Sequence, residues 1–141
     1  MKSAKYLLAA GAMAFALPAF AQDVSIEGAY VMPLAGMENA AALYMVIKNP
    51  TKALVTLFDG MTDAAAEVDV YSTIWTSKGE PQVLPQPEGL VVASAGGYTL
   101  SPGGVFLALT GLKAPLNAGD VINVTVKFAE GLELPVAAVV K

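Results

Sequence analysis

Apolar and polar side chains alternate along most of the chain after residue 22, with the period of two that is typical of half-buried β-strands. The clearest case is Val121–Phe128, in which every second side chain is apolar. The predicted inward face consists of Ile122, Val124, Val126 and Phe128. A short loop at 129–131 and a second apolar run over Leu132–Val140 complete a predicted hairpin.

Two further segments near the start of this region predict strands of different burial. Asn39–Pro50 is a nearly continuous apolar run, which predicts a strand buried on both faces; a short helix is the alternative, but the β-branched and aromatic content and the closing Asn-Pro favour a strand. Asp23–Met32 alternates and predicts one apolar face. The members of that face are Val24, Ile26, Tyr30 and Met32.

The remaining strands are short and separated by turn residues. We expect them at 54–58, 67–75, 90–92, 98–100 and 105–109. Lys78–Gly89 contains three prolines and predicts a loop or an irregular sheet edge. Many short strands with regular turns indicate one all-β domain, either a sandwich or a Greek-key barrel.

The first 21 residues have a different character. Lys2 and Lys5 precede an apolar run over 6–17, and Ala19-Phe20-Ala21 has the small-x-small form of a signal peptidase site. This order predicts a signal peptide, residues 1–21, cleaved before Gln22, with a buried N-terminal helix as the alternative. The predicted mature domain, 22–141, is then exported, to the periplasm in a bacterial cell. Without Cys, neither a disulfide nor a lipid anchor on Cys is expected.

Composition excludes several classes of function. Residues 22–141 hold six Lys and twelve acidic residues, a net charge of −6, and no Arg, so binding to nucleic acid or anionic lipid is not expected. The chain has no His, which together with the lack of Cys excludes nearly all zinc sites and Ser-His or Cys nucleophiles. Asp59, Asp63, Glu67 and Asp69 predict a solvated acidic face rather than an acid–base pair. We therefore expect no enzyme.

Several motifs together resemble one known family. They are "AYVM" at 29–32, "AALYMVIKN" at 41–49, "AAAEVDVY" at 64–71, "PGGVFLALTGLKAPLNAGD" at 102–120 and "VTVKFAEG" at 124–131. In this order they resemble the periplasmic copper chaperones called PCu(A)C, across nearly the whole predicted mature chain. The resemblance implies a single-domain, cupredoxin-like β-barrel, Cu(I) as the cargo, and copper delivery during cytochrome c oxidase assembly.

The resemblance also implies where the copper ligands should be. Members use two His and two Met near one mouth of the barrel, soft donors that suit Cu(I). Those positions fall here on Tyr71, Val83, Phe106 and Ala108, so all four ligands are replaced. Copper binding in the family manner is therefore not expected, and no cofactor is expected from the residues themselves.

Three interpretations of the replaced site remain open. In the first, the former ligand positions have become part of the core. In the second, Tyr71, Trp75 and Phe106, with Val83, form an exposed apolar patch that docks a periplasmic or membrane protein. In the third, Met32 and Met37, which flank a Pro-Gly loop, provide a relocated Cu(I) site.

Overall fold

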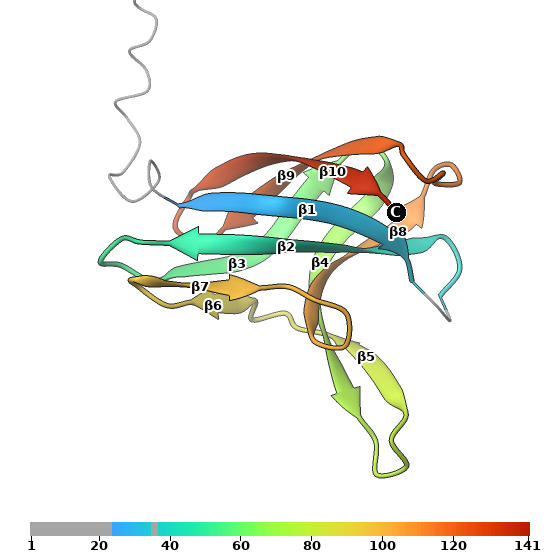
Figure 1. Ribbon diagram of the computed structural model, residues 1–141, viewed down its shortest axis with the longest axis horizontal. Helices are drawn as coiled ribbons and strands as arrows, with labels where there is room; N and C mark the ends of the chain where they lie inside the picture. Colours follow the sequence, from blue (N-terminus) through green and yellow to red (C-terminus); the bar gives the residue numbers. More distant parts are fainter. Residues whose placement is uncertain (1–23, 35–36) are drawn as a thin grey trace, which may run out of the picture.

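The computed structural model describes residues 24–34 and 37–141, and the predicted signal peptide lies outside this range. The described residues form β-strands and connecting turns (Figure 1). None of these residues forms an apolar helix of membrane-spanning length. The strands are β1 Ser25–Pro33, β2 Ala40–Asn49, β3 Val55–Thr62, β4 Ala65–Trp75, β5 Pro81–Pro85, β6 Leu90–Val92, β7 Gly96–Thr99, β8 Val105–Leu112, β9 Val121–Phe128 and β10 Glu133–Val140.

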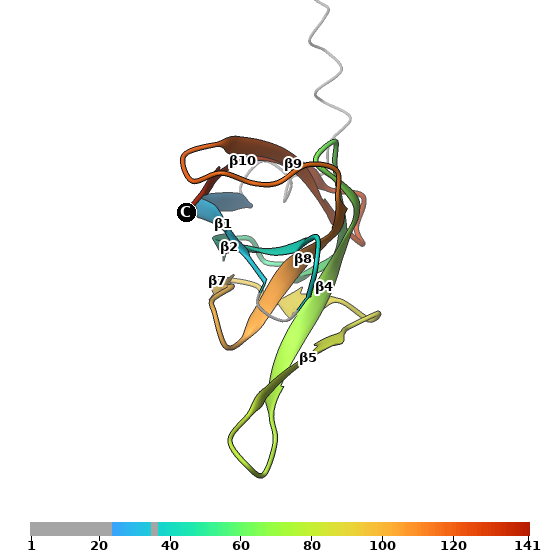
Figure 2. The same cartoon turned by 90° about the vertical axis from the view of Figure 1, so that its right-hand side faces the viewer.

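Seven of the strands close into a barrel. The order β4-β8-β2-β1-β10-β9-β3 is completed by a second pairing of β3 with β4, and β1 with β10 is the one parallel pair among the described strands. Figure 2 shows this ring from its end. β5, β6 and β7 add to it by pairing with β4, β3 and β2. The prediction of a single-domain, all-β barrel is confirmed.

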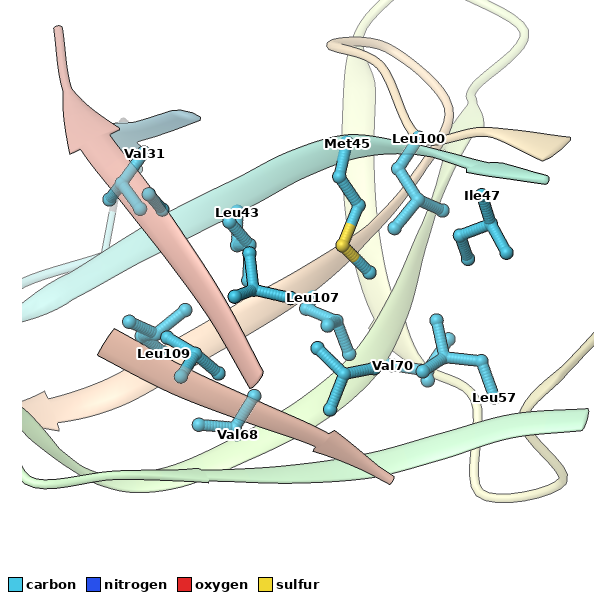
Figure 3. Close-up of a cluster of buried hydrophobic side chains, with 14 of the residues drawn as sticks. Val31, Leu43, Met45, Ile47, Leu57, Val68, Val70, Leu100, Leu107 and Leu109 are labelled. Carbon is cyan, nitrogen blue, oxygen red and sulfur yellow. The ribbon is translucent and has the colours of Figure 1, made fainter. Parts of the chain in front are cut away.

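The barrel interior is filled by alternate side chains of each strand. On β2 and β8 the inward residues include Leu43, Met45, Leu107 and Leu109, all of which are at most 1% exposed. Figure 3 shows Met45 among the other buried side chains of this core, so the methionine is a packing residue. The apolar run predicted as a doubly buried strand is β2, and the helical alternative is wrong.

The predicted apolar face of the first strand is only half right, because the strand contains a β-bulge. The register with β2 shifts between Glu27 and Tyr30, and Gly28 has a φ of 63°, which glycine adopts without strain. Before the bulge, Val24 and Ile26 face the core. After it, Val31 faces the core, while Tyr30 packs on the opposite face. An extra residue reverses the alternation, so Tyr30 and Met32 do not share the face of Val24.

The proline-rich segment contains an edge strand rather than only a loop. β5 pairs with the far half of β4 from Tyr71↔Pro85 to Trp75↔Pro81, and this hairpin projects beyond the barrel (Figures 1 and 2). A proline at each end of β5 limits further pairing at this open edge.

The short strand predicted at 98–100 begins earlier, as β7, because it pairs with the last residues of β2.

One buried polar side chain ties together the loops at the end of β2. Asn49 is fully buried, and its amide nitrogen donates to the carbonyl oxygens of Ala53, Val92 and Ala93. Its oxygen accepts from the backbone nitrogen and the hydroxyl of Thr51. This side chain thus satisfies backbone groups of two loops that have no strand partner there.

We expect Asn49→Ala to lower the free energy of unfolding by about 3 kcal/mol, because it removes the five hydrogen bonds of a fully buried side chain, including the one to the buried Val92 carbonyl. Urea denaturation measures the difference. Asn123→Ala, at an exposed position of β9, is the matched control and should change stability by less than about 0.5 kcal/mol. Equal losses in the two variants would contradict this role of Asn49.

Candidate functional site

The β2–β8 pair is buried on its outer face as well as in the barrel. Ala42, Tyr44, Phe106 and Ala108 form a second apolar cluster, and Tyr30, Leu34, Tyr71 and Val83 pack against it. Ala42 and Ala108 face each other across the strands and are fully buried. We call these eight residues the outer cluster.

Four aromatic rings cross the outer cluster in a row, one from each of four neighbouring strands. The centroid of the Phe106 ring lies 6.1 Å from that of Tyr71 and 6.1 Å from that of Tyr44. The ring centroids of Tyr44 and Tyr30 are 5.2 Å apart. The Lys141 ammonium lies 4.5 Å from the centroid of the Tyr30 ring. Such tilted and offset contacts stabilise aromatic pairs beyond the area they bury.

All four positions that the resemblance assigns to copper ligands lie in the outer cluster: Tyr71, Val83, Phe106 and Ala108. They come from three strands, and the registers Tyr71↔Phe106 and Thr73↔Val83 bring them together. They lie on the outer face of the sheet. The side chains present do not fit Cu(I), because none is a thioether, thiolate or imidazole.

The surrounding groups do not supply replacement ligands at these four positions. Burial, followed by the neighbouring Tyr30, raises the pKa of Tyr44, so this phenol stays protonated and is a poor metal donor. Among residues 24–34 and 37–141, no group of three or more His, Cys, Asp or Glu side chains is placed to hold a metal ion. The outer cluster is chemically a small apolar core.

The Pro-Gly-Gly turn before β8 places Phe106 in this cluster. The Gly104 carbonyl accepts from the backbone nitrogen of Thr73 at 3.0 Å and from its hydroxyl at 2.9 Å. Gly103 has a φ of 85°, and the ring of Trp75 lies beside it. The turn is thereby fixed to β4 at the base of the β4–β5 hairpin, which sets where β8 starts.

The three residues predicted to bind a partner have different environments. Phe106 is 2% exposed, so the expectation that its ring belongs to an exposed patch is wrong in this structure. The row of aromatic rings and the alanines beside it leave the ring no free face. Tyr71 is part-exposed, and Trp75 is 59% exposed on the projecting hairpin. Partner binding through Tyr71 and Trp75 stays a prediction.

Of the two methionines considered for a relocated site, Met32 lies beside the outer cluster. Met32 is opposite Ala42 in the β1–β2 register and is 40% exposed. Met37 is part-exposed in the following loop, where its backbone nitrogen donates to the Leu34 carbonyl. Met32 thus lies on β1, and Met37 lies in the loop that connects β1 with β2.

The structure brings two of the four predicted acidic-face residues directly opposite each other. Asp59 on β3 pairs in register with Asp69 on β4, whereas Asp63 and Glu67 are exposed. Burial raises the pKa of Asp69, and the charges of Glu67 and Asp59 raise it further. Sequence analysis did not pair these carboxylates, although β3 and β4 are consecutive strands joined by the two-residue turn at 63–64, a connection that favours a hairpin.

Comparison with known proteins identifies the family to which the chain is similar. The family model described as "Putative lipoprotein LpqE-like" matches residues 24–140. The chain is 31% identical over 145 residues to "Putative lipoprotein Lxx21020" of Leifsonia xyli subsp. xyli (strain CTCB07), covering 98% of this chain and 86% of that protein.

Solved structures show the same fold. The Cu(I)-bound DR1885 of Deinococcus radiodurans, studied in solution, is similar with a TM-score of 0.62 and 30% identity, over 81% of this chain and 75% of that one. The copper-bound PCuAC domain of PmoF2 has a TM-score of 0.64 and 20% identity, over 84% of this chain and 92% of that one.

We expect Phe106→Ala to lower the free energy of unfolding by about 3–5 kcal/mol, as for other buried aromatic side chains. Trp75→Ala should cost less than about 1.5 kcal/mol, because most of that side chain is already in water. Chemical denaturation of both variants measures the contrast. A smaller loss for Phe106→Ala than for Trp75→Ala would contradict the outer cluster as a core.

Asp69 should make stability depend on pH. Since folding raises the pKa of Asp69, its ionised form destabilises the folded state, and this penalty disappears as pH falls through the folded pKa toward the ordinary carboxyl value near 3.8. Asp69→Asn should therefore raise stability at pH 7, by about 0.5 kcal/mol, with a smaller gain at pH 4. Asp63→Asn carries the same charge change at an exposed turn and is the control; an equal gain there would overturn the assignment.

Proposed function

Because the chain belongs to the LpqE-like, PCuAC-like family, we propose that it is an exported member that carries no Cu(I) at the family's ligand positions and acts by binding another protein. One observation carries this proposal: Tyr71, Val83, Phe106 and Ala108 pack into an apolar cluster instead of forming a donor set. A cargo site has to admit and release its metal, whereas this cluster is filled by side chains.

The signal-like segment at 1–21 and the description of the family as lipoproteins both support export to the cell envelope. The sequence contains no Cys, so the proposal does not include a lipid attached to Cys. Copper-bound solved relatives support a place in copper handling, such as the assembly of a copper-containing oxidase. We infer a non-enzymatic role, since the sequence has no His or Cys to act as a nucleophile or to activate one.

The β4–β5 hairpin supports protein binding as the mode of action. It projects beyond the barrel, and Ile74, Trp75 and Leu84 on it are 42%, 59% and 40% exposed. Its base is fixed to the Pro-Gly-Gly turn by Thr73. The hairpin is held in place by this contact, and its exposed aromatic and aliphatic side chains are of the kinds found at the centres of protein–protein interfaces.

A second candidate function keeps Cu(I) as cargo at a relocated thioether site. It is favoured by the position of Met32, exposed and in register with Ala42 beside the former ligand row. Met37 would provide the second sulfur. Met-only sites suit Cu(I), which prefers soft ligands.

Titration with Cu(I) in competition with a chromophoric chelator separates these proposals. We expect the unmodified chain to bind Cu(I) no more tightly than a Kd of about 1 µM. Tyr71→His, Val83→Met, Phe106→His and Ala108→Met together should tighten binding by at least about a hundredfold, since they return soft donors to positions that already lie together.

Circular dichroism provides the folding control for the fourfold variant. Tight binding by the unmodified chain would contradict the proposed function. If that binding disappeared in Met32→Leu with Met37→Leu, the relocated site would be established. Should the fourfold variant not fold, the titrations of the unmodified chain and of this methionine variant still decide between the two functions.

A further inference from the structure

β3 and β4 separate immediately after the point at which they close the barrel. They pair at Asp59↔Asp69 and Gly60↔Val68 and nowhere else. Beyond these positions, β3 pairs with β6, while β4 continues into the hairpin with β5. Antiparallel strands that diverge in this way leave a fork, which has the two opposed carboxylates at its apex.

The segment after β5 turns this fork into a pocket. Gln86 donates from its backbone nitrogen to the Val70 carbonyl and from its side-chain amide to the Ser72 hydroxyl at 2.7 Å. Gly89 donates to the Gln86 carbonyl, which closes a tight turn beside Phe58. The pocket has a volume of about 330 Å³. Its lining comprises Phe58, Asp59, Asp69, Val70, Tyr71, Pro85, Gln86 and Pro87.

The lining combines negative charge with flat apolar walls. Asp59 and Asp69 provide two carboxylates, and one oxygen of Asp59 already accepts from the Gly60 nitrogen at 2.7 Å. Phe58, Tyr71 and the two prolines provide the walls. Tyr71 also belongs to the outer cluster, so the pocket adjoins the former ligand positions.

The charges around the pocket are unbalanced. Glu67 lies two residues before Asp69 on β4, and the nearest cation in register is Lys127, opposite Asp59 on β9. The one ion pair within the described part of the chain is Lys48–Glu27, which is elsewhere. Burial raises the pKa of Asp69, and the charges of Glu67 and Asp59 raise it further. A bound cation would relieve the repulsion between these carboxylates.

We propose that this pocket receives the guanidinium group of an arginine side chain on the partner protein, an inference that rests on the proposed protein-binding function. A guanidinium group presents a planar fork of N–H donors, which can bridge two carboxylates, and its faces stack on aromatic rings. A metal ion fits less well, since two carboxylates and a neutral amide give few ligands.

The sequence restricts the identity of this partner. The chain has no Arg at any position, so a second copy of it cannot supply the group. The partner is a different protein that presents an arginine within an apolar surface, which would contact Trp75 on the same face of β4 as Asp69 and Tyr71. The net charge of −6 over residues 22–141 would also attract a basic partner at long range.

The test uses N-acetyl-arginine-N-methylamide as the probe and the citrulline analogue, its neutral near-isostere, as the control. Each is titrated into the ¹⁵N-labelled protein over residues 22–141 or the full chain, and amide shifts are followed by NMR. We expect the arginine probe to shift the resonances of Asp59, Gly60, Asp69 and Gln86 with a Kd in the millimolar range. The citrulline probe should leave them unchanged.

Matched variants locate the binding. Asp69→Asn should weaken binding of the arginine probe about tenfold, while Asp63→Asn, an equal charge change outside the pocket, should leave it unchanged. Because Asp69→Asn is expected to stabilise the fold, lost binding cannot be attributed to unfolding. Equal binding of both probes, equal effects of both variants, or no shifts with arginine would each overturn the proposal. The Cu(I) titration of the unmodified chain, which tests the proposed function, uses a different probe and changes no residue of this pocket, so the two failures are distinguishable.

Discussion

Burial of the β2–β8 pair on both of its faces is the constraint on which the rest of the structure depends. One face fills the barrel with Leu43, Met45, Leu107 and Leu109, and the other supports the outer cluster. Because neither face meets water over residues 40–45 of β2 and 106–109 of β8, a polar side chain on either face there would need a buried partner. The apolar side chains of Phe106 and Ala108 are consistent with this constraint, and the row of aromatic rings packs over the outer face.

The same constraint explains why the paired carboxylate groups lie beside the outer cluster rather than in it. The carboxylates of Asp59 and Asp69 are held where β3 and β4 diverge, at the border between the barrel and the projecting hairpin. There the backbone is anchored by Thr73 and Gln86, while the side chains remain accessible. A chain of this family can thus carry apolar side chains at the positions that the resemblance assigns to copper ligands and still hold a firmly anchored hairpin beside them.

Sequence patterns predicted the strands well wherever alternation was regular. Val121–Phe128 was correct at both ends, and the apolar run at 39–50 was correctly assigned as a doubly buried strand. The first strand was wrong beyond Gly28, because a bulge changes the face of every later side chain without changing the composition. The convergence of Tyr71, Val83, Phe106 and Ala108 could be expected only from the family resemblance. Their burial depended on Tyr44 and Tyr30, which no short-range pattern links to them.

The sequence by itself determined the all-β class and the absence of His, Cys and Arg chemistry, since these follow from local periodicity and from residue identity. Its resemblance to the PCu(A)C family implied, in addition, that all four copper donors are replaced. Tertiary structure alone decided that Phe106 is core while Trp75 is exposed, and that Asp59 faces Asp69 across a pocket. The physical reason is that barrel closure pairs strands in a register and orientation set by the whole ring. The pairing of β3 with β4 follows from a local hairpin, but the divergence of the two strands and the place of the turn after β5 are outcomes of packing, which no local pattern of hydrophobic and polar residues specifies.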